Sequence, residues 1–211
     1  RVRNDAHRLI EEAMLAANVC SADFILQSKH PGLFRVHEGP TPEKKEILRN
    51  YLKASGVGMT ITDNPKPSEF QAIADATKER PDAQQIHAML LRSMQQAIYT
   101  PINSGHFGLA FEAYTHFTSP IRRYPDLLVH RVIKAILFQR RYQLPSLPTP
   151  GEAHAKLARR LASRVREPSQ KLAQKPPTTP DQQAWEAAGL HCSANERRAD
   201  EASRDVEAWL K

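Results

Sequence analysis

Six stretches of this sequence repeat apolar residues at three- and four-residue intervals, and this spacing predicts α-helices. The first runs from Asp5 to about Gln27 without a Gly or Pro, and Asn4 or Asp5 can cap it. The other five are expected at 43–55, 68–78, 82–99, 124–142 and 181–210. A chain with so many helices buries its apolar surface mainly by packing one helix against another. The predicted fold class is therefore α+β and helix-rich, with few short strands.

Two short segments between the helices have the features of strands. Residues 33–37 alternate apolar and polar side chains, and residues 108–117 form an apolar run bounded by turn residues. Ser68 can cap the helix at 68–78. The last helix is either interrupted at Gly189, with Ser193-x-x-Glu196 as a capping box for a new start, or continuous through these residues.

The charge of the chain favours a polyanionic partner such as RNA. The 211 residues carry a net charge of +7 with an isoelectric point near 9.6, and residues 118–175 hold thirteen basic but only three acidic side chains.

No apolar run approaches the ~18 residues that a membrane span needs, and no secretory signal is visible. Cys20 and Cys192 form no C-x-x-C pair. We therefore expect reduced thiols, no disulfide-linked partner, no membrane contact and a cytoplasmic location.

A turn or a helix start is expected just before the helix at 124–142. Ser119 can cap a helix, and Pro120 suits its first position. Pro125, however, has no N–H for a helical hydrogen bond. Residues 120–123 are therefore either the first helical turn or a separate turn.

Two adjacent arginines, Arg122 and Arg123, lie at this helix start. The free N–H groups and the dipole of a helix N-terminus attract anions, and guanidinium groups fit phosphate oxygens. The pattern thus favours a phosphodiester site in which the arginines stabilise charge that develops on the phosphate. The alternative is that one arginine pairs with a carboxylate such as Asp126 while the other lies on the surface.

Aromatic and ionisable side chains surround the two arginines in the sequence. The aromatic residues are Phe107, Phe111, Tyr114, Phe117 and Tyr124. Aromatic rings in such a segment are either core residues or platforms on which bases of single-stranded RNA stack. For His106 and His116, structural or phosphate-contacting roles fit better than metal binding, because no carboxylate cluster accompanies them. Glu11, four residues after His7, either lies on a solvated helix face or points into a channel.

Three separated blocks of this sequence resemble the ribonuclease II/ribonuclease R family. Their residues are more similar to those of bacterial ribonuclease R than to those of the rest of the family. The central block combines Gly105-His106-Phe107-Gly108-Leu109 with residues 114–127, which read YTHFTSPIRRYPDL. Residues 4–12 and 196–210 match further blocks in the same order. The resemblance covers nearly the whole chain except about 144–180.

This resemblance implies a portion of a processive, hydrolytic 3′-to-5′ exoribonuclease that degrades single-stranded and structured RNA to nucleoside 5′-monophosphates. In this family a single strand passes through a narrow channel to a Mg²⁺ site. By the resemblance, Arg122 is the catalytic arginine that contacts the scissile phosphate, and Arg123 grips an RNA phosphate. Glu11 matches a glutamate near the terminal nucleotide. The remaining RNA-binding candidates lie inside the signature and are Tyr114, His106 and His116.

Two departures from the family pattern limit what this chain is expected to do alone. The family's Mg²⁺-binding aspartates lie upstream of the first block, and no such cluster occurs here, so no metal ligand is assigned to this chain. We expect the flanking OB-type RNA-binding domains of the family to lie outside this chain as well. Residues 144–180 hold seven of the sixteen prolines and are predicted to be a Pro- and Arg-rich mobile insertion.

We therefore expect residues 1–211 to be part of an RNB catalytic domain, namely its downstream half, and to be inactive in isolation. The alternative from a different functional class is a non-catalytic RNA-binding module that retains the same fold.

Overall fold

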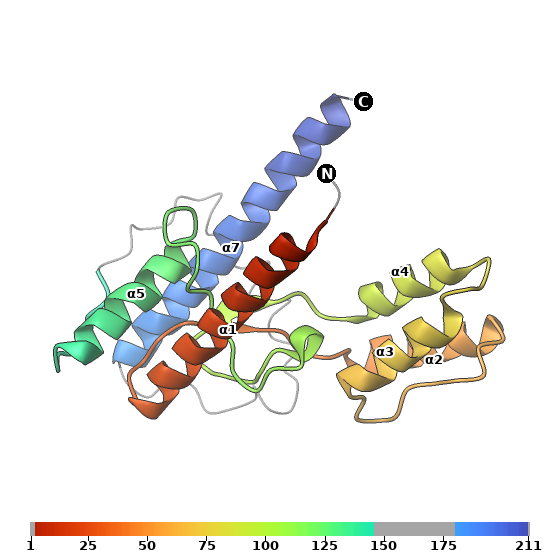
Figure 1. Ribbon diagram of the computed structural model, residues 1–211, viewed down its shortest axis with the longest axis horizontal. Coiled ribbons are helices and arrows are strands. Elements are labelled where there is room, and N and C mark those ends of the chain that lie inside the picture. Colours follow the sequence, from red (N-terminus) through yellow and green to blue (C-terminus); the bar gives the residue numbers. More distant parts are fainter. Residues whose placement is uncertain (1–2, 146–179, 211) are drawn as a thin grey trace. The chain divides into compact units, whose positions relative to one another are not determined.

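The computed structural model describes residues 3–145 and 180–210 and divides into two compact units (Figure 1). The first unit comprises residues 1–36, 98–103 and 113–211, and the second comprises 37–97 and 104–112. Six α-helices and one two-stranded sheet form within the described residues, which confirms the α+β, helix-rich class. The insertion predicted at 144–180 lies outside the described residues, apart from its two ends. No helix of the described part is both long and apolar enough to cross a membrane.

The described part of the first unit consists of three helices and a small sheet, and these elements come from distant parts of the sequence. They are α1 (Asp5–Gln27), β1 (Phe34–Val36), β2 (Ile98–Thr100), α5 (Tyr124–Leu137) and α7 (Pro180–Trp209). The two strands are antiparallel, with Arg35 opposite Tyr99. Helix α7 packs on β2, and α1 packs on α5. Their shared core is formed by Ala22, Ile25, Leu33, Phe34, Val36, Tyr99, Ala113, Leu128, Val129, Val132, Trp185, Ala188 and Cys192.

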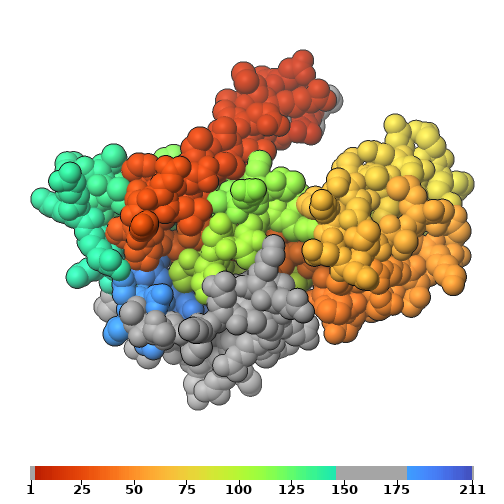
Figure 2. All heavy atoms as spheres, turned by 90° about the horizontal axis from the view of Figure 1, so that it is seen from below, coloured from red at the N-terminus to blue at the C-terminus, as the bar shows by residue number. Residues whose placement is uncertain are grey.

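Helix α1 forms where its spacing predicts, but only its second half is packed. Asn4 is its cap, because the Asn4 side chain accepts a hydrogen bond from the His7 N–H at 3.0 Å. The apolar residues of its first half are exposed, and the buried positions are Asn18, Ser21, Ala22 and Ile25. The first half of α1 projects from the body of its unit in Figure 2, and in Figure 1 the end of α7 reaches further still.

Helix α7 is continuous through Gly189, so the alternative of an interrupted helix is wrong. Glycine is needed there because a Cβ atom would lie 2.5 Å from the carbonyl oxygen of Tyr99. The Ser193 hydroxyl does not cap a helix. It donates to the Gly189 carbonyl at 2.8 Å and accepts from the Tyr99 N–H at 2.9 Å, and so joins α7 to β2.

The second unit is helical and has its own core. It contains α2 (Pro42–Ala54), α3 (Pro67–Thr77), α4 (Ala83–Ser93) and the short 3₁₀ helix η1 (Phe107–Leu109). The core is formed by Leu48, Leu52, Ile61, Phe70, Ile73, Ile86 and Leu90. Ser68 does not cap α3 as predicted. The cap position is Lys66, whose N–H donates to the Glu69 carboxylate at 2.8 Å.

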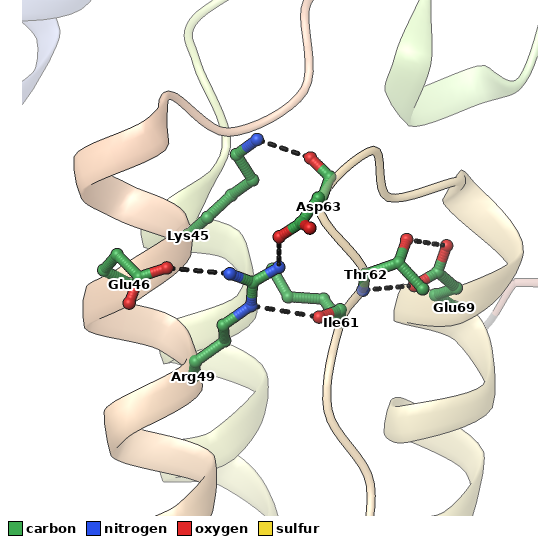
Figure 3. A network of polar contacts seen from close by, with 7 residues as sticks. All are labelled: Lys45, Glu46, Arg49, Ile61, Thr62, Asp63 and Glu69. Carbon is green, nitrogen blue, oxygen red and sulfur yellow. Dashed lines mark hydrogen bonds and ion pairs between the residues drawn. The ribbon is translucent and has the colours of Figure 1, made fainter.

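The loop between α2 and α3 is fixed by a polar network (Figure 3). The Arg49 guanidinium donates to the Asp63 carboxylate at 2.7 Å and to the Ile61 carbonyl at 3.1 Å. On the other side, Glu69 accepts from the Thr62 N–H at 2.8 Å. These contacts hold the loop between the two helices, and Ile61 in the loop is buried in the core.

Two predicted helix ends and one predicted strand are wrong. The helix expected at 82–99 ends at Ser93, because residues 98–100 pair with β1 instead. The run at 108–117 is not a strand, since η1 and the left-handed residue Ala110 (φ 57°) turn the chain back on itself. Helix α5 ends at Leu137 rather than near 142, because Gln139 is also left-handed (φ 54°).

Candidate functional site

The residues between Ser119 and Arg123 form a separate turn in front of α5. The N–H groups of Arg122 and Arg123 both donate to the Ser119 carbonyl, at 3.3 and 3.0 Å. Helix α5 then begins at Tyr124, with Pro125 in its first turn, where a missing N–H costs nothing. Of the two alternatives open from the sequence, the separate turn is correct.

The carboxylate of Asp126 connects the two ends of this turn. Its Oδ1 atom accepts from the Ser119 N–H at 2.7 Å and from the Arg123 guanidinium at 2.8 Å. Asp126 is fully buried, and the Arg123 side chain is only 20% exposed. Because Asp126 lies in the first turn of α5, the positive end of the helix dipole also stabilises its charge.

The two neighbouring arginines therefore differ in their surroundings. Arg123 is paired with Asp126, as the alternative interpretation of the sequence expected for one of them. Arg122 is exposed, next to the fully exposed Ile121, and its guanidinium has no acidic partner within the described residues. The Arg122 side chain can therefore bind a phosphate without first breaking an ion pair.

Buried hydrogen bonds hold the segment that leads into the turn. The Asn18 amide in α1 donates to the Tyr114 hydroxyl at 2.8 Å and accepts from the Phe117 N–H at 2.9 Å. His116 Nδ1 lies 2.8 Å from the Tyr99 hydroxyl, and the His116 ring contacts the Tyr114 ring edge-on at 5.8 Å. Two of the predicted site residues, Tyr114 and His116, are thus brought together beside β2.

An ion pair lies beside Tyr99. The Arg35 guanidinium lies 4.6 Å from the centre of the Tyr99 ring and donates to the Glu196 carboxylate at 2.7 Å. Burial raises the pKa of the Tyr99 hydroxyl, and the nearby positive charges of Arg35 and Arg123 oppose this shift only in part. Tyr99 is therefore a neutral hydrogen-bonding group at physiological pH.

Nothing local in the sequence identifies Arg35 or Tyr99 as site residues. Glu196 lies in the C-terminal block of the family resemblance, and this block is the one sequence signal that could have found it.

His106 and Glu11 have contacts of their own, with residues outside the hydrogen-bonded group around Tyr99. His106 belongs to the second unit, where its Nδ1 atom accepts from the Leu109 N–H at 3.2 Å and its ring lies 5.0 Å from the His37 ring. Glu11 is exposed on the first half of α1 and pairs with Arg3.

A cavity of about 280 Å³ in the second unit fits a phosphodiester poorly, because its walls are mainly apolar and include no Lys or Arg. Nor do the described residues fit a Mg²⁺ site, since they contain no group of three or more His, Cys, Asp or Glu side chains that could hold a metal ion. The turn at 119–123 is therefore the candidate site.

Comparison with known proteins places the chain in a family. The model of the RNB domain matches residues 1–139, which is more than half of the chain. The chain belongs to the RNB domain family. This RNB chain is 42% identical to ribonuclease R of Escherichia coli over 209 residues, which is 99% of the chain and 23% of the relative. It is 38% identical to ribonuclease R of Thermotoga maritima over 211 residues, or 100% of the chain and 26% of the relative. The RNB chain thus spans about a quarter of the length of these curated relatives.

Solved structures share the fold of this RNB chain. The apo form of Mycoplasma genitalium RNase R matches it with a TM-score of 0.74 at 24% identity, over 100% of the chain and 28% of that protein. The same enzyme in complex with ribose methylated single-stranded RNA matches with a TM-score of 0.73 at 23% identity and the same coverage. Yeast Ssd1, described as a pseudonuclease, matches 68% of the chain and 18% of its own length, with a TM-score of 0.58 at 25% identity.

Proposed function

We propose that this chain is a portion of a processive, hydrolytic 3′-to-5′ exoribonuclease, acting on single-stranded and structured RNA and releasing nucleoside 5′-monophosphates. Its own contribution is to bind the RNA backbone at the turn before α5. The observation on which this rests is the exposed Arg122 guanidinium, which has no acidic partner in the described structure and lies beside a helix N-terminus. The relatives named ribonuclease R, and the RNA complex among the similar structures, support RNA as the ligand.

The proposed role of Arg122 is to stabilise charge on the phosphate that is cleaved. Negative charge grows on the phosphate oxygens as the phosphorus is attacked, and a guanidinium group remains positive throughout the physiological pH range. The free N–H groups at the start of α5 add to the positive potential. Arg122 is therefore the proposed catalytic residue of this chain.

The other predicted site residues take two kinds of role in this proposal. The hydrogen bonds of Arg123, Tyr114 and His116 support roles in holding the turn and the segment before it. Glu11 and His106 remain proposed RNA contacts. Mg²⁺ is proposed to be bound by carboxylates outside this chain, because the described residues offer no cluster for it.

Binding of a fluorescent single-stranded oligoribonucleotide to the 211-residue chain tests the RNA site. We expect the salt dependence of the affinity to fall by about 0.7 in log–log slope for Arg122→Ala, the change for one phosphate contact on a single strand. Arg92→Ala, which removes another exposed arginine, is the matched control and should leave the slope unchanged. Equal slopes for Arg122→Ala and the unaltered chain would reject Arg122 as a phosphate ligand.

The catalytic role of Arg122 is tested in a longer polypeptide that cleaves RNA. There, Arg122→Ala should raise the activation free energy of cleavage by at least about 2–3 kcal/mol while weakening RNA binding less. Equal losses of rate and affinity would leave Arg122 with a binding role alone.

A non-catalytic RNA-binding module is the second candidate function. It is favoured by the similarity to the pseudonuclease Ssd1 and by the lack of a metal-binding cluster in the described residues. This candidate predicts salt-sensitive RNA binding with no release of monophosphate in Mg²⁺, both by this chain and by the longer protein. Release of monophosphate by either one would eliminate it.

A further inference from the structure

We propose that the pair of Asp126 and Arg123 is a positioning device for Arg122, so that the two neighbouring arginines have different jobs. Arg122 is the phosphate ligand, and Arg123 together with Asp126 fixes the turn on which Arg122 is presented. This inference rests on the proposed function, because it takes Arg122 as the ligand.

The first support is that Asp126 holds the turn at both of its ends. One carboxylate oxygen accepts from the Ser119 N–H at 2.7 Å, where the turn begins, and from Arg123 at 2.8 Å, where it ends. The residues between these two anchor points include Ile121 and Arg122, which are exposed. A turn held at both ends leaves its tip few orientations, and this preorganisation favours ligand binding at the tip.

The second support is that burial restricts Arg123 to this pairing. Asp126 is 0% exposed and the Arg123 side chain is 20% exposed. The Arg123 Nε atom and the Asp126 Oδ2 atom are buried and have no hydrogen-bond partner within the described structure. Withdrawing Arg123 to bind RNA would leave a fully buried carboxylate without its counter-charge, which is strongly unfavourable. Arg122 can bind a phosphate without this penalty.

The third support is the connection of the turn to α5. Asp126 is in the first turn of α5, and the Leu127 N–H donates to the Arg123 carbonyl at 3.4 Å. Leu128, Val129 and Val132 anchor α5 in the core of the first unit. The carboxylate therefore transfers the rigidity of a packed helix to an exposed loop.

A charge-neutral double replacement separates positioning from electrostatics. Arg123→Met with Asp126→Leu removes one positive and one negative charge, so the net charge of the chain is unchanged. We expect this variant to bind the single-stranded oligoribonucleotide about tenfold more weakly, as expected for the loss of a well-oriented charged contact. The matched control is Arg80→Met with Asp82→Asn, which removes an ion pair of 2.8 Å in the second unit and should leave the affinity unchanged.

The same replacement made in the Arg122→Ala chain shows whether the pair acts through Arg122. A positioning pair has nothing left to position there, so we expect no further loss of affinity. A loss that persists in the Arg122→Ala chain, or a double replacement that binds as tightly as the unaltered chain, would overturn the inference. If Arg122→Ala itself has no effect, the proposed function fails instead, and the two failures are thereby distinguished.

Thermal melting guards against a trivial loss of folding. Should Arg123→Met with Asp126→Leu fail to melt cooperatively, Arg123→Met with Asp126→Asn replaces it, because the asparagine oxygen can still accept from the Ser119 N–H. The same tenfold loss is expected. Arg123→Ala made in the Arg122→Ala chain gives the opposing test: a salt slope lowered by about 0.7 beyond that of Arg122→Ala, with an unchanged melting temperature, would show that Arg123 binds phosphate directly, and would refute the division of roles.

Discussion

Replacing Gly189 with alanine should destabilise the protein, although alanine is the better helix former. Gly189 lies in the middle of α7, where helix propensity alone would favour alanine by about 1 kcal/mol. The added Cβ, however, would lie 2.5 Å from the Tyr99 carbonyl oxygen and 3.1 Å from the Tyr99 carbonyl carbon. The neighbours are backbone atoms of β2, which cannot rotate away as a flexible side chain can.

The magnitude follows from the displacement that alanine requires. Ordinary contact begins at 3.4 Å, so α7 and β2 would have to separate by about 0.9 Å. Overpacking of this kind costs roughly 1–3 kcal/mol, and rigid backbone places this site at the upper end of that range. After the gain in helix propensity, we expect a net loss of about 2 kcal/mol, or a melting temperature lower by about 4–8 °C for a chain of this size.

Thermal unfolding followed by far-UV circular dichroism measures this effect. Gly58→Ala is the matched control, since a Cβ at Gly58 meets nothing within 4 Å and its φ is not in the left-handed region. The control should melt within the range of ordinary surface changes, about ±0.5 kcal/mol. A Gly189→Ala chain that melts at or above the unaltered chain would refute the argument that α7 and β2 are in backbone contact.

Three further predictions follow from buried or tightly bonded polar groups. Burial raises the pKa of the Cys192 thiol to about 12, whereas Cys20 is exposed. We therefore expect one thiol per folded chain, that of Cys20, to react rapidly with an aromatic disulfide reagent at pH 8. Rapid reaction of two thiols would contradict the burial of Cys192. Asn18→Ala should lower the free energy of unfolding by about 2 kcal/mol in urea titrations, because it removes two buried hydrogen bonds, one to the Tyr114 hydroxyl and one from the Phe117 N–H. Asn50→Ala on the exposed face of α2 should be neutral. Hydrogen bonds from the N–H groups of Thr62 and Lys66 lower the pKa of Glu69 in the folded chain. The ionised Glu69 therefore stabilises the fold at pH values above the pKa that this carboxyl has in the unfolded chain. This stabilisation is lost as the pH falls through the pKa of the folded chain. Glu69→Gln should therefore show a smaller drop in urea midpoint between pH 7 and pH 3, and an unchanged drop would count against this role.

Local signals were sufficient to predict most helices. The apolar spacing predicts α1, α2 and α3 to within one or two residues, because helical hydrogen bonds join residues that are close in the sequence. The signature around Arg122 also places the candidate site before the structure is known. The same local reasoning fails at β2, which continues an apolar helical pattern but pairs with β1 far earlier in the chain.

What only the tertiary structure decides is which charges compensate each other. The chemistry of a helix start does not tell which of the two adjacent arginines pairs with Asp126. Their different surroundings depend on the burial of Asp126, on the Ser119 N–H that it binds, and on the packing of α5 that buries it. The Arg35–Glu196 pair beside Tyr99 likewise joins residues from β1 and α7, and no local pattern announces it. The physical reason is that helix formation depends on neighbours in the sequence, whereas desolvation and ion pairing depend on neighbours in space.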